Sequence, residues 1–489
     1  MENAFDIAII GGGINGAGIA RDAAGRGLKV VLFEQSDLAG ATSSASTKLI
    51  HGGLRYLEHY GFRLVREALA EREILARIAP HNIWPLRFIL PHHKGLRPRW
   101  LLSLGLVIYD MLGNKSFARA QAINVAEDRD ASALRPEFRK AFTYADCWTD
   151  DARLVVLNAR DAFERGADIR VRTQVTSVIR EEKCWRLEAV TEEGARQEVR
   201  AKAIVNAAGP WVSDIVSRAG VAEKSKARIV KGSHIVVPKI FDGESAFILQ
   251  QGDGRIVFCI PYERDFTLIG TTDEEFEGDP KGVRISESEI AYLCAAASEY
   301  FRKQVVPKDV TWSYAGVRAL FDDRSSKAQE VTRDYVLALD ANGPPILSIY
   351  GGKLTTYRRL AEGVLTSFSE YFPRAPRWTD QAPLPGGEFK REEFDAVVQR
   401  LRNAHDFLTH HHAVRLVHAY GMRAFGIFTG ADDLGETFGG DLTAREVDYL
   451  VANEWAQTVE DVLWRRTKIG LRAGGGDVAR LEVYLAKRR

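Results

Sequence analysis

The apolar positions at the start of the chain predict a strand, a helix and a second strand in close succession. Residues 5–10 are almost continuously apolar, which is typical of a strand buried on both faces of a parallel sheet. Glycines follow at once, an alanine-rich helical stretch spans 17–24, and a second apolar run at 29–33 ends at Glu34. These residues form a complete predicted β-α-β unit.

Further apolar segments predict two kinds of strand. The runs 203–208 and 346–350 end in small residues or glycines and resemble the first strand. The segments 233–237, 256–260 and 266–269 have the length and composition of strands in an antiparallel sheet. The order of elements therefore predicts a parallel sheet interrupted by an antiparallel one.

A proline-rich stretch precedes the C-terminal part of the chain. Four of the 16 prolines lie between Pro373 and Pro385, and two glycines follow. Such a stretch cannot continue a helix or a central strand, so we expect a linker over 373–387. Beyond it, apolar residues recur at helical spacing without strand alternation, which predicts a helical domain over 388–489.

The turn after the first strand has the spacing G-x-G-x-x-G, with Gly11, Gly13 and Gly16. The first glycine permits a tight turn, the second lets the backbone approach a pyrophosphate, and the third lets the helix pack closely on the strand. The N–H groups at the helix start attract negative charge. Glu34 can accept hydrogen bonds from an adenosine ribose, which disfavours NADP. The unit is therefore predicted to bind a dinucleotide.

Three later elements favour FAD over NAD as that dinucleotide. A run of small hydroxyl residues over 41–47 suits a loop around a pyrophosphate and a flavin, and the strand 203–208 leads to Gly209. After the strand 346–350, a glycine pair and residues 353–357 open another helix, whose N-terminus can stabilise negative charge on a flavin. A domain assembled from separate segments fits FAD, and we expect tight, noncovalent binding.

The overall composition excludes other classes of protein. The 489 residues carry 67 Lys and Arg against 66 Asp and Glu, which argues against a nucleic-acid binder. The four cysteines have no metal-site or disulfide spacing, which fits a reducing, cytoplasmic compartment. The start of the chain lacks a secretory signal pattern, and the longest apolar run, 100–112, is shorter than the roughly 20 residues of a membrane span. The histidines at 410–412 point in different directions on a helix, so no metal site is expected.

At the level of motifs, the chain resembles the bacterial respiratory, FAD-dependent sn-glycerol-3-phosphate dehydrogenases, a family in the flavoprotein superfamily that includes D-amino-acid oxidase. The resemblance covers nearly the whole chain, and the run 43–58 carries it most specifically. The matching motifs lie at 6–34, 41–60, 231–238, 270–273, 315–318 and 351–357. The resemblance implies oxidation of sn-glycerol 3-phosphate at C2 to dihydroxyacetone phosphate by hydride transfer to FAD, with electrons passed to a membrane quinone.

The resemblance also implies the residues that act on the substrate. The cations suited to a phosphorylated substrate are Arg55, Arg318 and Lys353, and Arg318 is placed to polarise the C2 oxygen. The proton acceptor is expected to be a histidine, because imidazole titrates near neutrality. Both His51 and His234 lie in the motifs, and the sequence leaves the choice open.

Other residues are expected to bind substrate or cofactor. Tyr56 and Thr271 are candidates for hydrogen bonds to the substrate, and Asp273 is a candidate for orienting a neighbouring loop. No metal ligand is expected. The expected FAD contacts are Gly11, Gly13, Gly16, Glu34, Thr42, Ser43, Ser44, Ser46, Val175, Gly209, Gly352, Leu354 and Thr355.

Together these patterns predict an α/β protein with a discontinuous Rossmann-like FAD domain, an antiparallel-sheet substrate domain and a C-terminal, all-helical cap domain. The predicted ranges are 1–80, 140–225 and 330–372 for the FAD domain, 81–139 and 226–329 for the substrate domain, 373–387 for the linker and 388–489 for the cap.

The resemblance places the protein in the cytoplasm, peripherally attached to the inner face of the cytoplasmic membrane, and leaves a homodimer open. The basic stretch 92–102, followed by the apolar residues 104–109, is a candidate membrane contact, with a buried core helix as the alternative. An oxidase that passes electrons to oxygen and a noncatalytic flavin-binding sensor are the alternative functions. The basic residues Arg465, Arg466 and Lys468 are expected at an exposed helix end.

Overall fold

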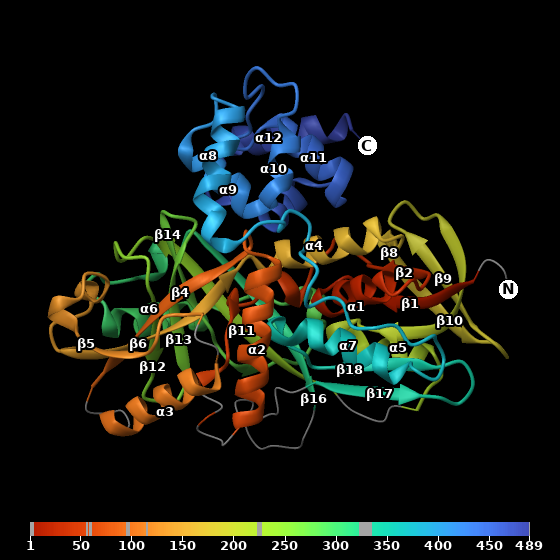
Figure 1. The fold of residues 1–489 in the computed structure, drawn as a ribbon, viewed down its shortest axis with the longest axis horizontal. Helices are drawn as coiled ribbons and strands as arrows, with labels where there is room; N and C mark the ends of the chain where they lie inside the picture. Colours follow the sequence, from red (N-terminus) through yellow and green to blue (C-terminus); the bar gives the residue numbers. More distant parts are fainter. Residues whose placement is uncertain are drawn as a thin grey trace.

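The structure is a computed structural model, and it describes residues 4–54, 57, 61–93, 98–113, 116–222, 227–321 and 335–488. Two large sheets lie side by side, and a group of C-terminal helices covers both at one end (Figure 1). The first sheet is mostly parallel, and the second is largely antiparallel. The predicted fold class is therefore confirmed.

The first sheet has eight strands and is built around the predicted β-α-β unit. The strand β1 pairs in parallel with β2 on one side and with β10 on the other, and β10 pairs in parallel with β18. The order is β17-β18-β10-β1-β2-β7, and the hairpin β8-β9 joins through β10. The strands are β1 (Phe5–Ile10), β2 (Val30–Phe33), β7 (Asp168–Arg170), β8 (Thr173–Arg180), β9 (Trp185–Thr191), β10 (Arg196–Asn206), β17 (Val336–Asp340) and β18 (Ile346–Tyr350).

Helix α1 (Ile14–Gly25) is enclosed because its side chains are small. It packs against α4 (Asp151–Glu164) and α7 (Tyr357–Ser367), and nearly all its residues are buried. A Cβ on Gly18 would lie 2.6 Å from the Tyr357 ring, so glycine and alanine let the two helices come close to α1. This packing fixes the helix start at the end of β1.

The second sheet has ten strands in the order β15-β11-β14-β13-β12-β4-β6-β3, with β16 beside β11 and β5 beside β6. The predicted strands at 233–237, 256–260 and 266–269 pair antiparallel as β11, β13 and β14. The strands are β3 (Leu49–Ile50), β4 (Ile83–His92), β5 (Gln121–Asn124), β6 (Lys140–Thr149), β11 (Ala227–Pro238), β12 (Ala246–Gln250), β13 (Ile256–Tyr262), β14 (Phe266–Gly270), β15 (Glu274–Glu275) and β16 (Trp312–Phe321).

The sheets divide the chain differently from the predicted ranges at two places. The strands β3 and β6 hydrogen-bond within the second sheet, although they lie in the ranges 1–80 and 140–225. Because β6 leads directly into α4, which packs on the first sheet, one continuous segment passes between the sheets. The domain boundaries themselves stay predictions.

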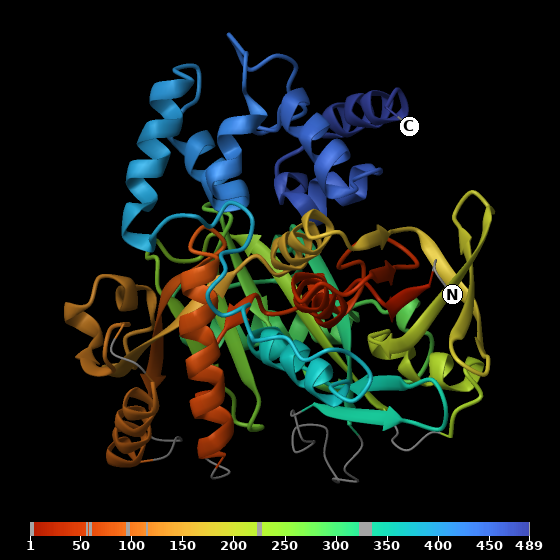
Figure 2. The same ribbon diagram turned by 45° about the vertical axis from the view of Figure 1, so that its right-hand side comes forward.

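The C-terminal part is helical, and its apolar side chains form a separate core cluster. Figure 2 shows these helices above the edges of both sheets. They are α8 (Phe394–Ala404), α9 (His410–Tyr420), α10 (Ala424–Ile427), α11 (Ala444–Glu454) and α12 (Gly475–Ala486), with a π-helical turn at Asp461–Arg466. The remaining helices are α2 (Phe62–Ile78), α3 (Arg99–Leu112), α5 (Val212–Arg218) and α6 (Glu287–Tyr300).

The prediction of an exposed basic end at residues 465–468 is wrong. Arg466 has no exposed surface, and its guanidinium contacts both oxygens of Asp37 at 2.7 Å. Arg465 also contacts Asp37, and Lys468 pairs with Asp150 at 2.8 Å. These cations meet carboxylates of the first-sheet region, so they fasten the C-terminal helices to it.

The segment 373–387 contains no helix or strand, as its prolines predict, but it is packed against α1. The Trp378 ring lies where a Cβ on Gly25 would be, 2.0 Å away. Arg21 of α1 donates to the carbonyl oxygen of Ala382 at 2.8 Å. The segment is therefore held in place along its length.

Two histidines with lowered pKa lie where the C-terminal helices meet the rest of the chain. His81 has no exposed surface, and neither ring nitrogen has a hydrogen-bond partner among the described residues. Burial, and after it the positive charge of Arg153, lowers the pKa of His81 to about 3. Burial lowers the pKa of His418 to about 4, and its Nδ1 lies 3.0 Å from the His81 carbonyl oxygen.

We expect His81→Leu to reduce the loss of stability in acid. In the unfolded chain the imidazole has its ordinary pKa near 6.5, so unfolding takes up a proton once the pH falls below that value. The stability from neutral His81 is complete above about pH 6.5 and falls by roughly 2 kcal/mol on going to pH 5. The free energy of unfolding, measured by denaturant titration near pH 7 and at pH 5, should therefore fall by roughly 2 kcal/mol less in the variant than in wild type between these two pH values.

The exposed His411 provides the control, since His411→Gln should keep the wild-type pH dependence. A His81→Leu variant whose unfolding free energy falls as steeply as that of wild type would contradict the prediction.

Candidate active site

The glycine turn after β1 brings three stretches of backbone close together. Gly11 has a φ of +114°, and a Cβ on it would lie 2.4 Å from the carbonyl oxygen of Ala207, which follows β10. A Cβ on Gly16 would lie 1.9 Å from the carbonyl oxygen of Gly11. Side chains are excluded at both positions, so the start of α1 remains close to the ends of β1 and β10.

Glu34 lies at the end of β2, beside the same turn. Its Oε2 accepts a hydrogen bond from Gly12 N–H at 2.7 Å, and its Oε1 accepts one from Ser36 N–H at 2.8 Å. Burial raises the pKa of the Glu34 carboxyl, and these two N–H groups oppose that shift. The carboxylate keeps further acceptor lone pairs, which the predicted ribose contact requires.

Residues 42–48 form a loop that joins the two sheets. Ser43 Oγ accepts a hydrogen bond from Ile14 N–H at 3.0 Å, at the start of α1. Thr42 Oγ1 donates to the carbonyl oxygen of Val317 in β16 at 2.5 Å. The loop therefore contacts the glycine turn and the second sheet at once.

Glycines in the second sheet make room for this loop and for a buried histidine. A Cβ on Gly316 would lie 2.6 Å from Ala45 of the loop. A Cβ on Gly270 would lie 2.0 Å from the His234 ring on the neighbouring strand. Any larger residue at these positions would displace the loop or the imidazole.

His234 is enclosed where the loop meets the sheet. It has no exposed surface, its Nε2 lies 3.0 Å from Thr47 Oγ1, and its ring stacks on Tyr314 with 4.8 Å between centroids. Burial, followed by the positive charges of Arg318 and Lys48, holds the pKa of His234 well below its usual range. The imidazole is therefore neutral at physiological pH.

His51 follows β3 and contacts the turn after β18. Its N–H donates to Thr355 Oγ1 at 3.3 Å, and the Thr355 hydroxyl donates to the His51 carbonyl oxygen at 3.4 Å. The next N–H, that of Gly52, donates to Tyr109 Oη at 2.9 Å. His51 is partly exposed, in contrast to His234, and its backbone is held by two elements.

The turn after β18 also contacts the start of α1. Asn15 Nδ2 donates to the Gly351 carbonyl oxygen at 3.3 Å, and a Cβ on Gly352 would lie 2.7 Å from the same amide. Asn15 Oδ1 is buried without a hydrogen-bond partner among the described residues. Lys353, next in the chain, is partly exposed.

Arg318 projects from β16 beside these residues. Its Nη1 donates to Asp273 Oδ1 at 2.7 Å, so Asp273 contacts a strand residue, and its role in orienting a neighbouring loop stays a prediction. A Cβ on Gly232 would lie 3.1 Å from Arg318 Nη2 and 2.8 Å from Thr271 Oγ1. The Gly351 N–H donates to the carbonyl oxygen of the residue after Arg318 at 2.8 Å, which brings β16 to the turn after β18.

Most predicted site residues thus converge at the junction of the two sheets, although their roles stay predictions. Arg55 and Tyr56 lie outside the described residues. Val175 is buried in β8, where its carbonyl oxygen accepts from Arg218, and Gly209 begins the turn after β10. The predicted residues at the junction are Gly11, Gly13, Gly16, Thr42, Ser43, Ser44, Ser46, His51, His234, Thr271, Arg318, Gly352, Lys353, Leu354 and Thr355.

Five further residues contact the site or its loop and were not predicted from the sequence. Thr47 ends the hydroxyl-rich run and Lys48 follows it directly, so that run was the available signal for both. Asn15, Tyr314 and Asp151 have no local signal, because their contacts join segments far apart in the chain.

The glycine cradle fits the pyrophosphate of FAD. The start of α1 has no side chains at its closest approaches, and Ser43 lies over Gly13. The buried Asn15 Oδ1, which lacks a donor among the described residues, is suited to accept from a hydroxyl or N–H group of the cofactor. The adjoining face carries a histidine and two cations, which suits the oxidation of an anionic alcohol.

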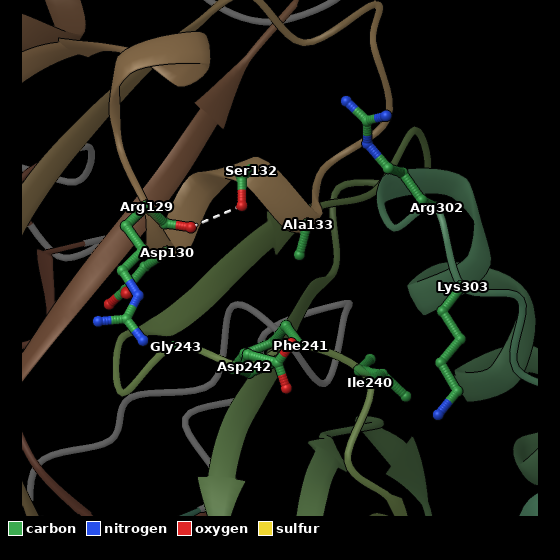
Figure 3. A pocket seen from close by; sticks show the side chains of 10 residues that line it. All are labelled: Arg129, Asp130, Ser132, Ala133, Ile240, Phe241, Asp242, Gly243, Arg302 and Lys303. Atoms are coloured by element: carbon green, nitrogen blue, oxygen red, sulfur yellow. Dashed lines mark hydrogen bonds between the residues drawn. The ribbon is translucent and has the colours of Figure 1, made fainter.

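A separate cavity of about 410 Å³ lies away from this junction (Figure 3). It is lined by Arg129, Asp130, Phe241, Arg302 and Lys303, among others, and none of its lining residues belongs to the motifs above. Its cations are surface residues whose side chains point apart. Within the described ranges, no group of three or more His, Cys, Asp or Glu side chains is arranged to hold a metal ion.

The sequence is similar to two known protein families and to named enzymes. Residues 6–358 match the family of FAD dependent oxidoreductases, and residues 377–482 match the C-terminal domain of alpha-glycerophosphate oxidase. A glycerol-3-phosphate dehydrogenase of Pseudomonas aeruginosa is 51% identical, over 99% of this chain and 96% of that protein. A D-erythritol 1-phosphate dehydrogenase of Brucella abortus is 49% identical, over 95% and 94%.

A solved structure has the same architecture over the whole chain. The glycerol-3-phosphate dehydrogenase from Bacillus halodurans, complexed with FAD, aligns with a TM-score of 0.78 and 26% identity, covering 100% of this chain and 90% of that one. These matches confirm FAD as the predicted dinucleotide and an oxidoreductase as the predicted class of enzyme. Motifs, fold and relatives agree, and the chain belongs to the family of FAD-dependent glycerol-3-phosphate dehydrogenases.

Proposed function

We propose that this protein oxidises sn-glycerol 3-phosphate at C2 to dihydroxyacetone phosphate. The observation that carries the proposal is the convergence of His51, Arg318 and Lys353 at the turn after β18, which contacts the start of α1 through Asn15. When bound, FAD supplies the acceptor for the hydride that leaves the carbon. The protein residues then have three tasks, which are to hold the phosphate, to orient the alcohol and to take its proton.

His51 is the proton acceptor in this proposal. Loss of a hydride from C2 requires loss of the hydroxyl proton, so the base must reach the substrate oxygen. His51 is partly exposed, whereas His234 has no exposed surface and its Nε2 is engaged with Thr47. His234 is then a positioning residue that supports the loop from within the sheet.

In this proposal one cation contacts the C2 oxygen of the substrate and another contacts its phosphate. Arg318 is held by Asp273, so its planar guanidinium has a fixed orientation suited to the C2 oxygen. Lys353 offers a point charge for the phosphate, on the turn that also contacts His51 through Thr355. Arg55 lies outside the described residues, and its contact with the phosphate stays a prediction.

Two relatives of nearly equal identity differ in the substrate that they are named for, one with a three-carbon and one with a four-carbon polyol phosphate. Both substrates carry a phosphate and a secondary hydroxyl, so the same histidine and cations would serve either one. We favour glycerol 3-phosphate because the motif at 43–58 resembles the enzymes that oxidise it.

A membrane quinone is the proposed electron acceptor, and α3 is the proposed contact with the membrane. No described helix is both long and apolar enough to cross a bilayer. On α3, however, Trp100, Leu104, Val107 and Met111 are exposed to 68%, 48%, 49% and 78%. Their spacing places them on one helix face, and only Leu106 and Tyr109 of the helix are fully buried.

The alternative for this stretch, a buried core helix, holds for only one face, because Leu106 and Tyr109 pack in the core while the opposite face is exposed. An exposed apolar stripe marks an interaction surface, and the helix begins with Arg99, at the end of the basic stretch 92–99 of the sequence. Basic residues beside an apolar helix face suit an anionic lipid surface, where a lipid-soluble quinone is found.

The first test is the reaction of the bound flavin with substrate under anaerobic conditions. Glycerol 3-phosphate should bleach the yellow protein rapidly, D-erythritol 1-phosphate about tenfold or more slowly, and glycerol barely at all, because it lacks the charged group. Stopped-flow absorbance of the flavin gives all three rates. A faster reaction with the four-carbon substrate would reassign the substrate, and no reaction with either would refute the proposal.

The second test separates the two histidines. His51→Asn should slow the bleaching by roughly 10²–10⁴-fold without changing the FAD content, because the proton acceptor is lost. His234→Asn should cost less, since that ring lies inside the sheet. A larger loss for His234→Asn than for His51→Asn would reverse the assignment.

The third test concerns the acceptor and the membrane. Trp100→Gln/Met111→Gln should abolish flotation with anionic vesicles while turnover with a soluble dye acceptor is kept. Val483→Gln, at an equally apolar and 58% exposed position of α12, should float like wild type. If the double variant still floats, the membrane contact lies elsewhere. If wild type is a dimer and the double variant is a monomer, α3 is a self-association surface instead.

The electron acceptor is tested separately. Peroxide formed stoichiometrically with product in oxygenated buffer would identify oxygen, and not a quinone, as the acceptor.

A further inference from the structure

A buried ion pair holds the 42–48 loop on the side away from the second sheet. Lys48 Nζ donates to Asp151 Oδ1 at 2.6 Å, and the two side chains are exposed to only 1% and 0%. Ser46 donates its N–H and its hydroxyl to the other carboxylate oxygen, Oδ2, at 3.1 and 2.7 Å. The ammonium also donates to the Ser44 carbonyl oxygen at 3.1 Å. One carboxylate at the start of α4 therefore binds two residues of the loop.

This arrangement is costly for a residue that serves only packing. Both charges lose their hydration, and in general a buried ion pair stabilises a fold no better than apolar side chains of the same volume. Lys48 also has a φ of +60°, a conformation that non-glycine residues rarely adopt and that clusters at functional sites. The pair fixes a geometry that an apolar contact could not specify.

The geometry that it fixes is that of the loop against His234. Thr47, whose hydroxyl contacts His234 Nε2, lies between the two residues that Asp151 binds. Tyr314, which stacks on the His234 ring, donates to the Ser46 carbonyl oxygen at 2.8 Å. Both neighbours of the imidazole are thus connected to the same carboxylate.

The neighbouring carboxylate has a cation of its own. Asp150 caps the start of α4 by accepting from Arg153 N–H, and it pairs with Lys468 of the C-terminal helices. Asp151 pairs instead with Lys48 of the loop, so each of the two adjacent carboxylates has its own cation.

We propose that Lys48 and Asp151 are a positioning pair, which fixes the loop so that Ser43 meets the start of α1 and Thr47 meets His234. The pair thereby serves FAD binding and the substrate face together. The inference rests on the proposed function only where turnover is measured, because retention of FAD can be followed without substrate.

The test compares two carboxylates of the same helix. Asp161, also on α4, pairs with the buried Arg21 at 2.6 Å and does not touch the loop. We expect Asp151→Asn to release FAD from the diluted holoenzyme about tenfold or more faster than wild type, as flavin fluorescence reports. Asp161→Asn should release FAD at the wild-type rate even where both variants lose thermal stability. Equal release rates from the two variants would refute the proposal.

A second pair of variants avoids an unpaired buried charge. Ser46→Ala removes the hydroxyl that donates to Asp151 and accepts from the Lys48 N–H at 2.9 Å, but it leaves both charges paired. It should therefore fold, release FAD faster and bleach more slowly with glycerol 3-phosphate at an unchanged KM. Ser46→Thr keeps the hydroxyl and should restore both rates. Unchanged FAD release in Ser46→Ala, or no recovery in Ser46→Thr, would overturn the proposal. Should FAD release follow these expectations while glycerol 3-phosphate fails to bleach the flavin of the wild-type protein, the proposed function is refuted and the positioning pair is not.

Discussion

Close approach between backbones is the constraint on which this architecture depends. The start of α1 can lie against β1 and β10 only because Gly11 and Gly16 have no side chain: a Cβ on either would lie 2.4 or 1.9 Å from a backbone carbonyl oxygen. The loop 42–48 lies on the second sheet for the same reason, at Gly316. These contacts bring the FAD cradle and the substrate face to one junction, which neither sheet could form alone.

Buried ion pairs hold segments that are distant in the sequence in one arrangement. Arg466 and Asp37 join the C-terminal helices to the first-sheet region, and Lys48 and Asp151 join the loop to α4. In both places the partners are far apart in the sequence and have almost no exposed surface. Buried pairs of this kind cost desolvation and leave a charge uncompensated if one partner is lost, so they favour a single arrangement over alternatives.

The parts that the sequence predicted correctly are those in which the signal is local. The strand 5–10, the glycine spacing and Glu34 follow one another within a short stretch, so apolar pattern and turn chemistry were sufficient. The antiparallel strands and the helical C-terminal part were predicted from periodicity for the same reason.

The parts that were missed depend on contacts between distant segments. The basic residues at 465–468 are predicted to be exposed because nothing nearby in the sequence indicates their partner. Asp37, which pairs with the buried Arg466, lies 429 positions earlier. The contacts of Asp151 with Lys48 were invisible for the same reason, since 103 positions separate them. The apolar residues of α3 fit a buried or an exposed face equally well, and only the fold shows that Trp100, Leu104, Val107 and Met111 are exposed.

The orientation of α3 has a consequence for how that helix can vary. Its inner face carries Tyr109, whose hydroxyl donates to Asp146 at 2.8 Å and accepts from the N–H of Gly52, the residue after His51. Rotation of the helix about its own axis would break both bonds, so the same tyrosine that holds the His51 backbone also determines the direction in which Trp100 and Met111 face. Substitutions on the outer face are therefore free to change its chemistry, whereas insertion or deletion of one residue within α3 would turn the stripe by about 100° and disconnect it from the active site.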